Sequence, residues 1–242
     1  MGACSNGSRG LFVGGSTTNV IQYITISTTG DTTDFGDLTL ARRSIDVCSD
    51  GTKGVFGGGS IAGVNPVNTI DYITVSTAGN ATDFGDVTVA RYDGDGCSDG
   101  TKGVFGGGYT DANVNIIDYV TIATTGNATD FGDLTAAKAG PSSCSDTTRG
   151  LWAGGVTSGY INVIEYITIA STGNATDFGD LTVARGESAG ACSDATKGVF
   201  GGGYTGSASS VIDYVTIAST GDATDFGNLT VARYALAACS GD

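Results

Sequence analysis

Hydrophobic and polar positions repeat along this chain with a long period, and each period contains the same order of short apolar runs. The most regular run is DFGDLT or a close variant, and its five copies, at residues 34–39, 83–88, 130–135, 177–182 and 225–230, lie 47 to 49 residues apart. A fixed period of this size is typical of repeat proteins, in which no copy buries a hydrophobic core alone. The pattern therefore predicts a single domain that spans residues 1–242.

Each period predicts four β-strands, which we name a to d. Strand a ends near a cysteine (for example residues 234–240), strand b is GVFGGG (54–59), strand c is the most apolar (69–75), and strand d is FGDLTVAR (178–185). Tight-turn residues such as Asp-Gly separate strands a and b. Neither face of strand c is uniformly polar, which is typical of a sheet that packs between neighbouring sheets. Five sets of four antiparallel strands predict an all-β, five-bladed β-propeller.

The two ends of the chain predict how the propeller closes. Residues 232–242 contain a complete strand a, whereas the N-terminal residues that precede strand b hold only the last part of one. We therefore expect the C-terminal strand to join the first blade, because this would remove an exposed sheet edge. An open array would normally carry atypical capping repeats.

The order of features within each period resembles the kelch repeat. A glycine pair (Gly58 and Gly59), a strand with Tyr72 and an aromatic residue at Phe84 recur in every copy. The resemblance implies a propeller in which the glycine pair ends strand b and the aromatic residue opens strand d. The chain departs from kelch in having phenylalanine instead of tryptophan, short modules, and five copies instead of six or seven. The FGGG and DFGDLT segments are also similar to repeats in tail-associated structural proteins of marine phages, which implies a virion location.

The charge pattern bears on possible partners. The formal net charge is −14, and all basic residues except Arg43 occupy two positions of the repeat: Arg9, Lys53, Lys102, Arg149 and Lys197 in one, and Arg42, Arg91, Lys138, Arg185 and Arg233 in the other. Phosphate binding requires clustered cations, so neither nucleic acid nor anionic lipid is an expected partner. The sequence contains no signal peptide pattern and no apolar run of membrane-spanning length, so we expect no membrane insertion and a location in a virion or the cytoplasm.

The cysteines and acidic residues indicate no metal, cofactor or catalytic centre. The six cysteines share one position of the repeat, too far apart for disulfides, and we expect free thiols in the core. The chain has no histidine and no CxxC motif, which argues against zinc and against histidine-based catalysis. Asp34 and Asp37 could bind Ca²⁺ with their equivalents, but no dense acidic cluster accompanies them. A turn-capping role, with an ion pair between Asp37 and Arg42 inside the blade, fits them better.

Two segments differ among the five copies. One follows strand b, and the other follows strand d; their copies are residues 16–19, 60–68, 109–115, 156–162 and 204–209, and residues 43–47, 92–96, 139–143, 186–191 and 234–238. Alternate connections of an antiparallel sheet emerge at opposite ends, so both segments are predicted to lie on one face. They could vary because nothing constrains them, or because they bind a ligand. All tyrosines outside strand c fall in these segments, and we predict ligand binding by Tyr92, Tyr109, Tyr160, Tyr204, Tyr234, Asp93 and Asp111.

These observations favour a non-enzymatic binding or structural module, of a virion or an adhesin, that docks a protein or glycan on this face. Other virion proteins are further candidate partners. The alternative is a lectin with one sugar pocket per blade. A glycoside hydrolase is a third reading, which would use two of the non-repeated acids Asp93, Asp95, Asp111 and Glu187.

Overall fold

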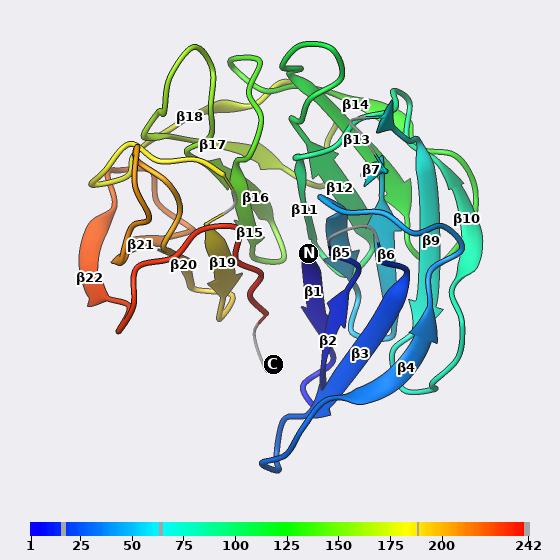
Figure 1. The fold of residues 1–242 in the computed structure, drawn as a ribbon. Coiled ribbons are helices and arrows are strands. Elements are labelled where there is room, and N and C mark those ends of the chain that lie inside the picture. Colours follow the sequence, from blue (N-terminus) through cyan, green and yellow to red (C-terminus); the bar gives the residue numbers. More distant parts are fainter. Residues whose placement is uncertain (16–17, 63–64, 188, 240–242) are drawn as a thin grey trace.

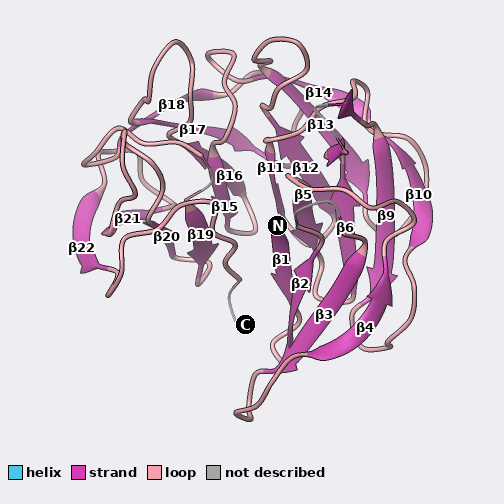
Figure 2. Ribbon diagram, in the orientation of Figure 1, coloured by secondary structure: helices cyan, strands magenta, loops and turns pink. Residues whose placement is uncertain are grey.

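The computed structural model describes residues 1–15, 18–62, 65–187 and 189–239, and it confirms the five-bladed β-propeller. Five four-stranded antiparallel sheets are arranged around a central axis (Figure 1), and no helix occurs among the described residues (Figure 2). It follows that the described part of the chain has no helix able to cross a membrane.

Each blade is built from consecutive strands, with strand a nearest the axis. The strands of the first blade are β1 (Gly2–Ser5), β2 (Arg9–Val13), β3 (Val20–Thr25) and β4 (Thr33–Asp37). Those of the second are β5 (Asp46–Ser49), β6 (Lys53–Gly57), β9 (Thr69–Thr74) and β10 (Thr82–Asp86), with a short hairpin of β7 (Ser60–Ile61) and β8 (Asn65–Pro66) between β6 and β9. Those of the third are β11 (Asp95–Ser98), β12 (Lys102–Gly106), β13 (Ile116–Thr121) and β14 (Thr129–Asp133). Those of the fourth are β15 (Ser142–Ser145), β16 (Arg149–Ala153), β17 (Val163–Thr168) and β18 (Thr176–Asp180). Those of the fifth are β19 (Gly190–Ser193), β20 (Lys197–Gly201), β21 (Val211–Thr216) and β22 (Thr224–Asn228).

Strands b and d are shorter than the sequence predicts. Strand b of the second blade ends at Gly57, because Gly58 and Gly59 have φ values of 60° and 108° and leave the strand. Strand d of the first blade ends at Asp37, and Thr39 beyond it bonds the next blade: its amide lies 3.2 Å from a carboxylate oxygen of Asp71. Strand b thus ends at a change of backbone conformation, and strand d ends where the chain turns to bond the next blade.

The hydrophobic core consists of four clusters, one at each junction between consecutive blades. At the first junction, Phe35 and Leu38 of the first blade pack with Phe56, Ile73 and Val75 of the second. Equivalent residues form the other three clusters. Each sheet is therefore buried on both faces, as the apolar strand c predicts.

At each of the four junctions a buried ion pair joins a cation that lies just beyond strand d of one blade to an acid on strand c of the next. The pairs are Arg42–Asp71, Arg91–Asp118, Lys138–Glu165 and Arg185–Asp213. The Arg42 guanidinium lies 2.9 Å from the Asp71 carboxylate, and both side chains are fully buried. This corrects the expected pair between Asp37 and Arg42. Asp37 lies on the outermost strand, whereas the arginine side chain reaches into the junction, where Phe56 also offers its carbonyl oxygen at 3.0 Å.

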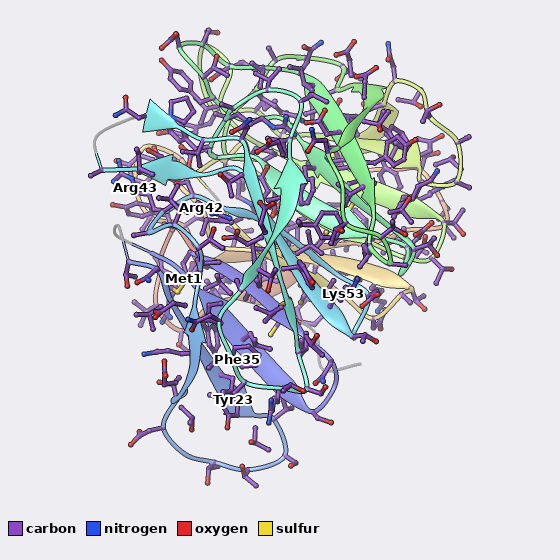
Figure 3. The ribbon with its side chains drawn as sticks, turned by 90° about the vertical axis from the view of Figure 1, so that its right-hand side faces the viewer. Met1, Tyr23, Phe35, Arg42, Arg43 and Lys53 are labelled. Carbon is purple, nitrogen blue, oxygen red and sulfur yellow. The ribbon has the colours of Figure 1, made fainter. Side chains whose placement is uncertain are left out.

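The set of basic residues that includes Arg9 and Lys53 stacks on the tyrosines of strand c. The guanidinium of Arg9 lies 4.5 Å from the centre of the Tyr23 ring, and the lysine or arginine of every other blade repeats this contact. Tyr23 in turn meets Phe35 edge-on at 6.0 Å, and the two rings lie side by side in Figure 3. Figure 3 also places Arg42 and Lys53, one from each basic set, well apart. All five cations of this set, and all of the other set except Arg233, thus have structural partners.

The closure differs from the one expected. Strand a of the first blade is β1, supplied by the N-terminus, and no residue from 229 to 239 belongs to a strand (Ser240 lies outside the described residues). The C-terminal segment does not form strand a of the first blade, because β1 already pairs with the inner edge of β2. It lies instead between β19 and β1, as Figure 1 shows.

Five of the six cysteines lie on the inner strands, as their shared position in the repeat predicts, and Cys239 lies in the C-terminal segment, which forms no strand among the described residues. Cys4, Cys48, Cys97 and Cys144 are buried free thiols, and Cys239 is a partly exposed one. The expectation of buried thiols is confirmed for the first four and is wrong for Cys239, which lies in the partly exposed C-terminal segment.

Candidate functional site

The two variable segments meet on one face of the propeller, as the sequence predicts. Short backbone bridges join the segment that follows strand d to the segment that follows strand b of the next blade: Arg43 with Ser60, Tyr92 with Tyr109, Ala139 with Val156, and Gly186 with Tyr204. We call this surface the loop face. Residues 16, 17, 63, 64 and 188 of the variable segments lie outside the described residues.

The backbone of the loop face is held by reciprocal hydrogen bonds. The amide of Tyr109 lies 2.7 Å from the carbonyl oxygen of Tyr92, and the amide of Tyr92 lies 3.1 Å from the carbonyl oxygen of Tyr109. The Tyr109 hydroxyl donates to the carbonyl of Asp111 at 3.1 Å. The loops are therefore pre-formed, and a ligand would not need to order them.

One residue of each connection from strand d to strand a has a left-handed backbone conformation. The five equivalent residues are Ser44, Asp93, Gly140, Glu187 and Ala235, with φ values of 52° to 60°. Non-glycine residues rarely adopt this region, so four such residues at one position of the repeat mark a shape that the fold imposes. All five line a central cavity of about 620 Å³.

This cavity brings together some of the residues that the sequence singled out. Tyr109, Tyr234 and Asp93 line it. Three other tyrosines do not line the cavity: Tyr92, Tyr160 and Tyr204. Two of them contact a lining tyrosine, with ring centres 5.5 Å apart for Tyr92 and Tyr109 and 5.1 Å apart for Tyr204 and Tyr234. Tyr160 contacts Tyr204, with ring centres 5.7 Å apart. Asp111 is exposed and does not line the cavity.

The cavity is acidic. Asp93, Asp95 and Glu187 line it, and among the lining side chains none is basic. Burial raises the pKa of Asp95 to about 6, although backbone hydrogen bonds from Ser143 and Gly96 oppose the shift. Burial lowers the pKa of the Met1 amino group, and the nearby charges of Asp93 and Asp95 oppose that shift.

Sequence reasoning missed two polar residues near the cavity. Asn113 lines it and donates from its side-chain amide to the carbonyl of Val156 at 2.8 Å. Asp46 is 1% exposed, and neither of its carboxylate oxygens has a hydrogen-bond partner among the described residues. Burial raises its pKa well above the usual range. Asp46 could have been noticed, because the other copies have Gly2, Asp95, Ser142, Gly190 and Ala237 at this position.

The described residues contain no group of three or more acidic, cysteine or histidine side chains that could hold a metal ion. Asp34 and Asp37, which were weighed as calcium ligands, belong to no such group, and the backbone next to them contacts the following blade. The amide of Asp37, for example, donates to the Asn80 side chain of the next blade at 3.0 Å.

No family model matches this sequence, and a search of curated proteins finds none that is similar to it. The resemblances to kelch repeats and to phage tail proteins therefore rest on the repeat pattern, and the five-bladed propeller is what the structure adds to them.

Proposed function

We propose that this protein is a non-enzymatic binding module that docks a protein partner on the loop face, over the central cavity. The observation that carries the proposal is the difference among equivalent positions. The left-handed residues that line the cavity are serine, aspartate, glycine, glutamate and alanine in the five connections, although the scaffold beneath them is nearly identical in each blade. A lectin with one pocket per blade would need the same residues in every copy. A single asymmetric site needs them to differ.

The chemistry of the cavity supports a basic group on the partner. Asp93 and Glu187 supply negative charge, and Tyr109 and Tyr234 supply aromatic surface, which also attracts cations. Tyrosine combines a large contact area with few rotatable bonds, so it costs little entropy on binding. A lysine or arginine side chain that enters the cavity would satisfy both groups.

A virion or adhesin setting fits this role. The basic side chains of the two repeat positions, other than Arg233, are engaged within and between blades, and the loop face is left for contacts with other molecules. Rigid scaffolds with variable loops are a common arrangement for recognition. The resemblance to phage tail proteins supports a virion location.

The experiment compares two arrays probed with the full-length chain. One array carries peptides with lysine or arginine flanked by varied residues, and the other carries glycans. We expect binding to basic peptides at a single site per chain, with Asp93→Asn and Tyr109→Ser each weakening it about tenfold or more, as expected for central contact residues. Asparagine tolerates the left-handed conformation at position 93, so the loop should keep its shape.

Asp111→Asn is the matched control, because Asp111 lies on the same face but outside the cavity. It should leave peptide binding unchanged. Binding to the glycan array with about one site per blade would favour the lectin instead. Peptide binding that is equally insensitive to substitution of Asp93 and Asp111 would show that the cavity is not the site.

A further inference from the structure

The C-terminal segment occupies the place of a sixth strand a, and the evidence is its contact with the fifth blade. A Cβ atom built on Gly190 would lie 3.3 Å from Cβ of Leu236 and 3.4 Å from Cβ of Ala238. The equivalent glycine of the first blade, Gly2, meets Ile45 and Val47 of the second blade in the same way. The segment therefore follows the fifth blade as β5 follows the first.

The same segment also precedes the first blade. A Cβ atom built on Gly10 would lie 3.6 Å from Sγ of Cys239, just as one built on Gly54 would lie 3.0 Å from Sγ of Cys4. A second cavity, with a volume of about 400 Å³, has among its lining residues six cysteines, one from each inner segment: Cys4, Cys48, Cys97, Cys144, Cys192 and Cys239. The described residues thus supply six inner segments and five sets of strands b, c and d. We call the space between the fifth and first blades, where a sixth set would lie, the open position.

The side of the fifth blade that borders the open position is bare. Phe226 is 59% exposed, whereas its equivalent Phe35 is 2% exposed in the junction with the second blade. Val231 is 60% exposed, and Leu229 is only partly buried, although its equivalent Leu38 is buried. Phe226 therefore occupies the repeat position of a junction residue, but no neighbouring blade covers it.

The facing side of the first blade is bare as well. Ile26 is 40% exposed, whereas its equivalent Val75 is fully buried. Phe12 and Ile24 are partly exposed, although Phe56 and Ile73 at the same positions of the second blade are buried. Both sides thus present the two halves of the apolar junction that the chain forms four times elsewhere.

Polar groups bordering the open position are unpaired in the same pattern. The amide of Asp37 donates to Asn80, and the amide of Gly79 donates to the carbonyl of Phe35 at 2.7 Å. The equivalents at the open position are the amides of Asn228 and Gly30, and within the described part of the chain neither has such a partner. Two rows of junction hydrogen bonds are therefore available to an added sheet.

The charges specify what the added sheet must carry. Arg233 is exposed, and among the described residues its Nε donates only to the carbonyl of Val231 at 3.4 Å, while its four equivalents are paired with buried carboxylates. On the other side, Gln22 stands at the position of Asp71 and cannot neutralise a cation. A direct junction between the fifth and first blades would therefore leave Arg233 buried without a counter-ion, which is costly.

We propose that the open position is a docking site for a partner polypeptide that adds three antiparallel strands of this repeat type. Strand b of the partner pairs with the C-terminal segment, as main-chain hydrogen bonding to a free strand edge allows. The partner carries an acidic residue opposite Arg233 and a neutral residue opposite Gln22. This proposal does not rest on the loop-face function: residues 234–238 of the C-terminal segment also line the cavity, but the added strands would cover the sides of the fifth and first blades.

A second copy of the chain fits this site less well. Its first blade would bring its own strand a, β1, into the place that the C-terminal segment already fills, and it would set Gln22 opposite Arg233. A partner that contributes strands b, c and d alone meets neither obstacle.

The test uses a peptide of residues 102–135 as the probe, added to the full chain. The peptide contains strands b, c and d of the third blade and the acid Asp118, and it stops before the cation Lys138. Hydrogen exchange at the amides of Asn228 and Gly30 is the readout, with the amide of Asp180, which already donates to Asp222 at 3.0 Å, as the internal reference. We expect exchange at both test amides to slow at least tenfold when the probe is present, and the reference to stay unchanged.

The charge requirement gives matched variants. Arg233→Gln in the chain and Asp118→Asn in the peptide should each weaken binding about tenfold, and the two changes together should weaken it little further. Arg233 is exposed, so its substitution leaves the fold intact. Full additivity of the two changes would contradict the predicted pair.

If the peptide aggregates, the same segment joined after residue 242 takes its place. The fused chain should unfold at a higher temperature than the original chain and should show the same protection at Asn228 and Gly30. The proposal is overturned if neither form protects these amides. It is also overturned if they are protected without any probe, in a monomer whose ring closes on itself or in a dimer in which a second copy fills the open position.

Discussion

Lys138 and Glu165 form, between the third and fourth blades, the buried ion pair that an arginine and an aspartate form at the other three junctions. The lysine side chain is one bond shorter than arginine, and the glutamate side chain is one methylene longer than aspartate. The two changes compensate, so the pair spans the same space. The junction therefore requires that the two side chains together span a fixed length and that their charges cancel. It does not require a particular residue at either position.

This compensation predicts the result of exchanging the pair. Glu165→Asp alone leaves a gap between two buried charges and should lower the free energy of unfolding by about 2 kcal/mol or more, because a poorly paired buried charge is strongly destabilising. Lys138→Arg alone overfills the junction and should cost about 1–3 kcal/mol. The double variant recreates the arginine–aspartate pair and should fall within about 1 kcal/mol of the original chain. Urea unfolding of the four proteins gives the coupling, and additive losses would contradict a shared junction.

Gly58 is required by both its conformation and its surroundings. Its φ is 60°, and a Cβ atom there would lie 2.6 Å from the carbonyl oxygen of Arg91. Gly100 also has a positive φ, 82°, but no atom lies within 4 Å of its Cβ position. Gly100→Ala should cost about 1–2 kcal/mol for the backbone alone. Gly58→Ala should cost clearly more in thermal or urea unfolding, and equal losses would mean that the close approach to Arg91 does not matter.

Asp46 makes stability depend on pH. Burial raises the pKa of its carboxyl group in the folded chain well above the usual value near 3.8, so between these two pKa values the folded state binds more protons than the unfolded state. The contribution of Asp46 to stability is therefore largest below about pH 4 and is lost as the pH rises through the folded-state pKa of this group. Asp46→Asn removes this loss. We expect the variant to be more stable than the original chain at pH 8, and its advantage to shrink toward pH 4.

Asp111→Asn is the control for this pH series, because Asp111 is exposed. It should show no pH-dependent difference from the original chain. Asp95→Asn should act in the same direction as Asp46→Asn, over a window from about pH 4 to the folded-state pKa of about 6. A stability difference for Asp46→Asn that stays constant from pH 4 to 8 would contradict the raised pKa.

The thiols should differ sharply in reactivity. Burial raises the pKa of Cys4 to about 12 and raises that of Cys48, Cys97 and Cys144 as well, so these four buried groups carry almost no thiolate at pH 8. Cys239 is only partly buried. Alkylation with iodoacetamide at pH 8, followed by peptide mass spectrometry, should label Cys239 and leave these four unmodified until the chain unfolds. Labelling of Cys97 in the folded chain would contradict the packing of the inner strands.

Much of the fold could be predicted from the sequence because the repeat reports the same local pattern five times. The apolar strand c, the turn glycines and the shared position of the cysteines each indicated sheets packed face to face, and the structure has them so. The positions of Tyr109, Tyr234 and Asp93 on one face followed from the alternation of connections. The partner of Arg42 could not be predicted, because Asp37 and Asp71 are both acids of the repeat and only packing selects the one in the next blade. Asp46 was missed for a similar reason: its burial depends on Gly94 and the third blade, and not on its neighbours in sequence.

The sequence by itself determined the blade, because alternating apolar residues, tight turns and glycine pairs act over a few residues and are repeated. Only the tertiary structure decided how the ends are arranged. Cys4 and Cys239 look like two parts of one strand when the repeats are counted, yet each holds a separate place around the axis, since β1 already fills the inner edge of the first sheet. Which strand completes which sheet depends on the angle between packed blades, and that angle is set by side chains that come together only in the folded chain.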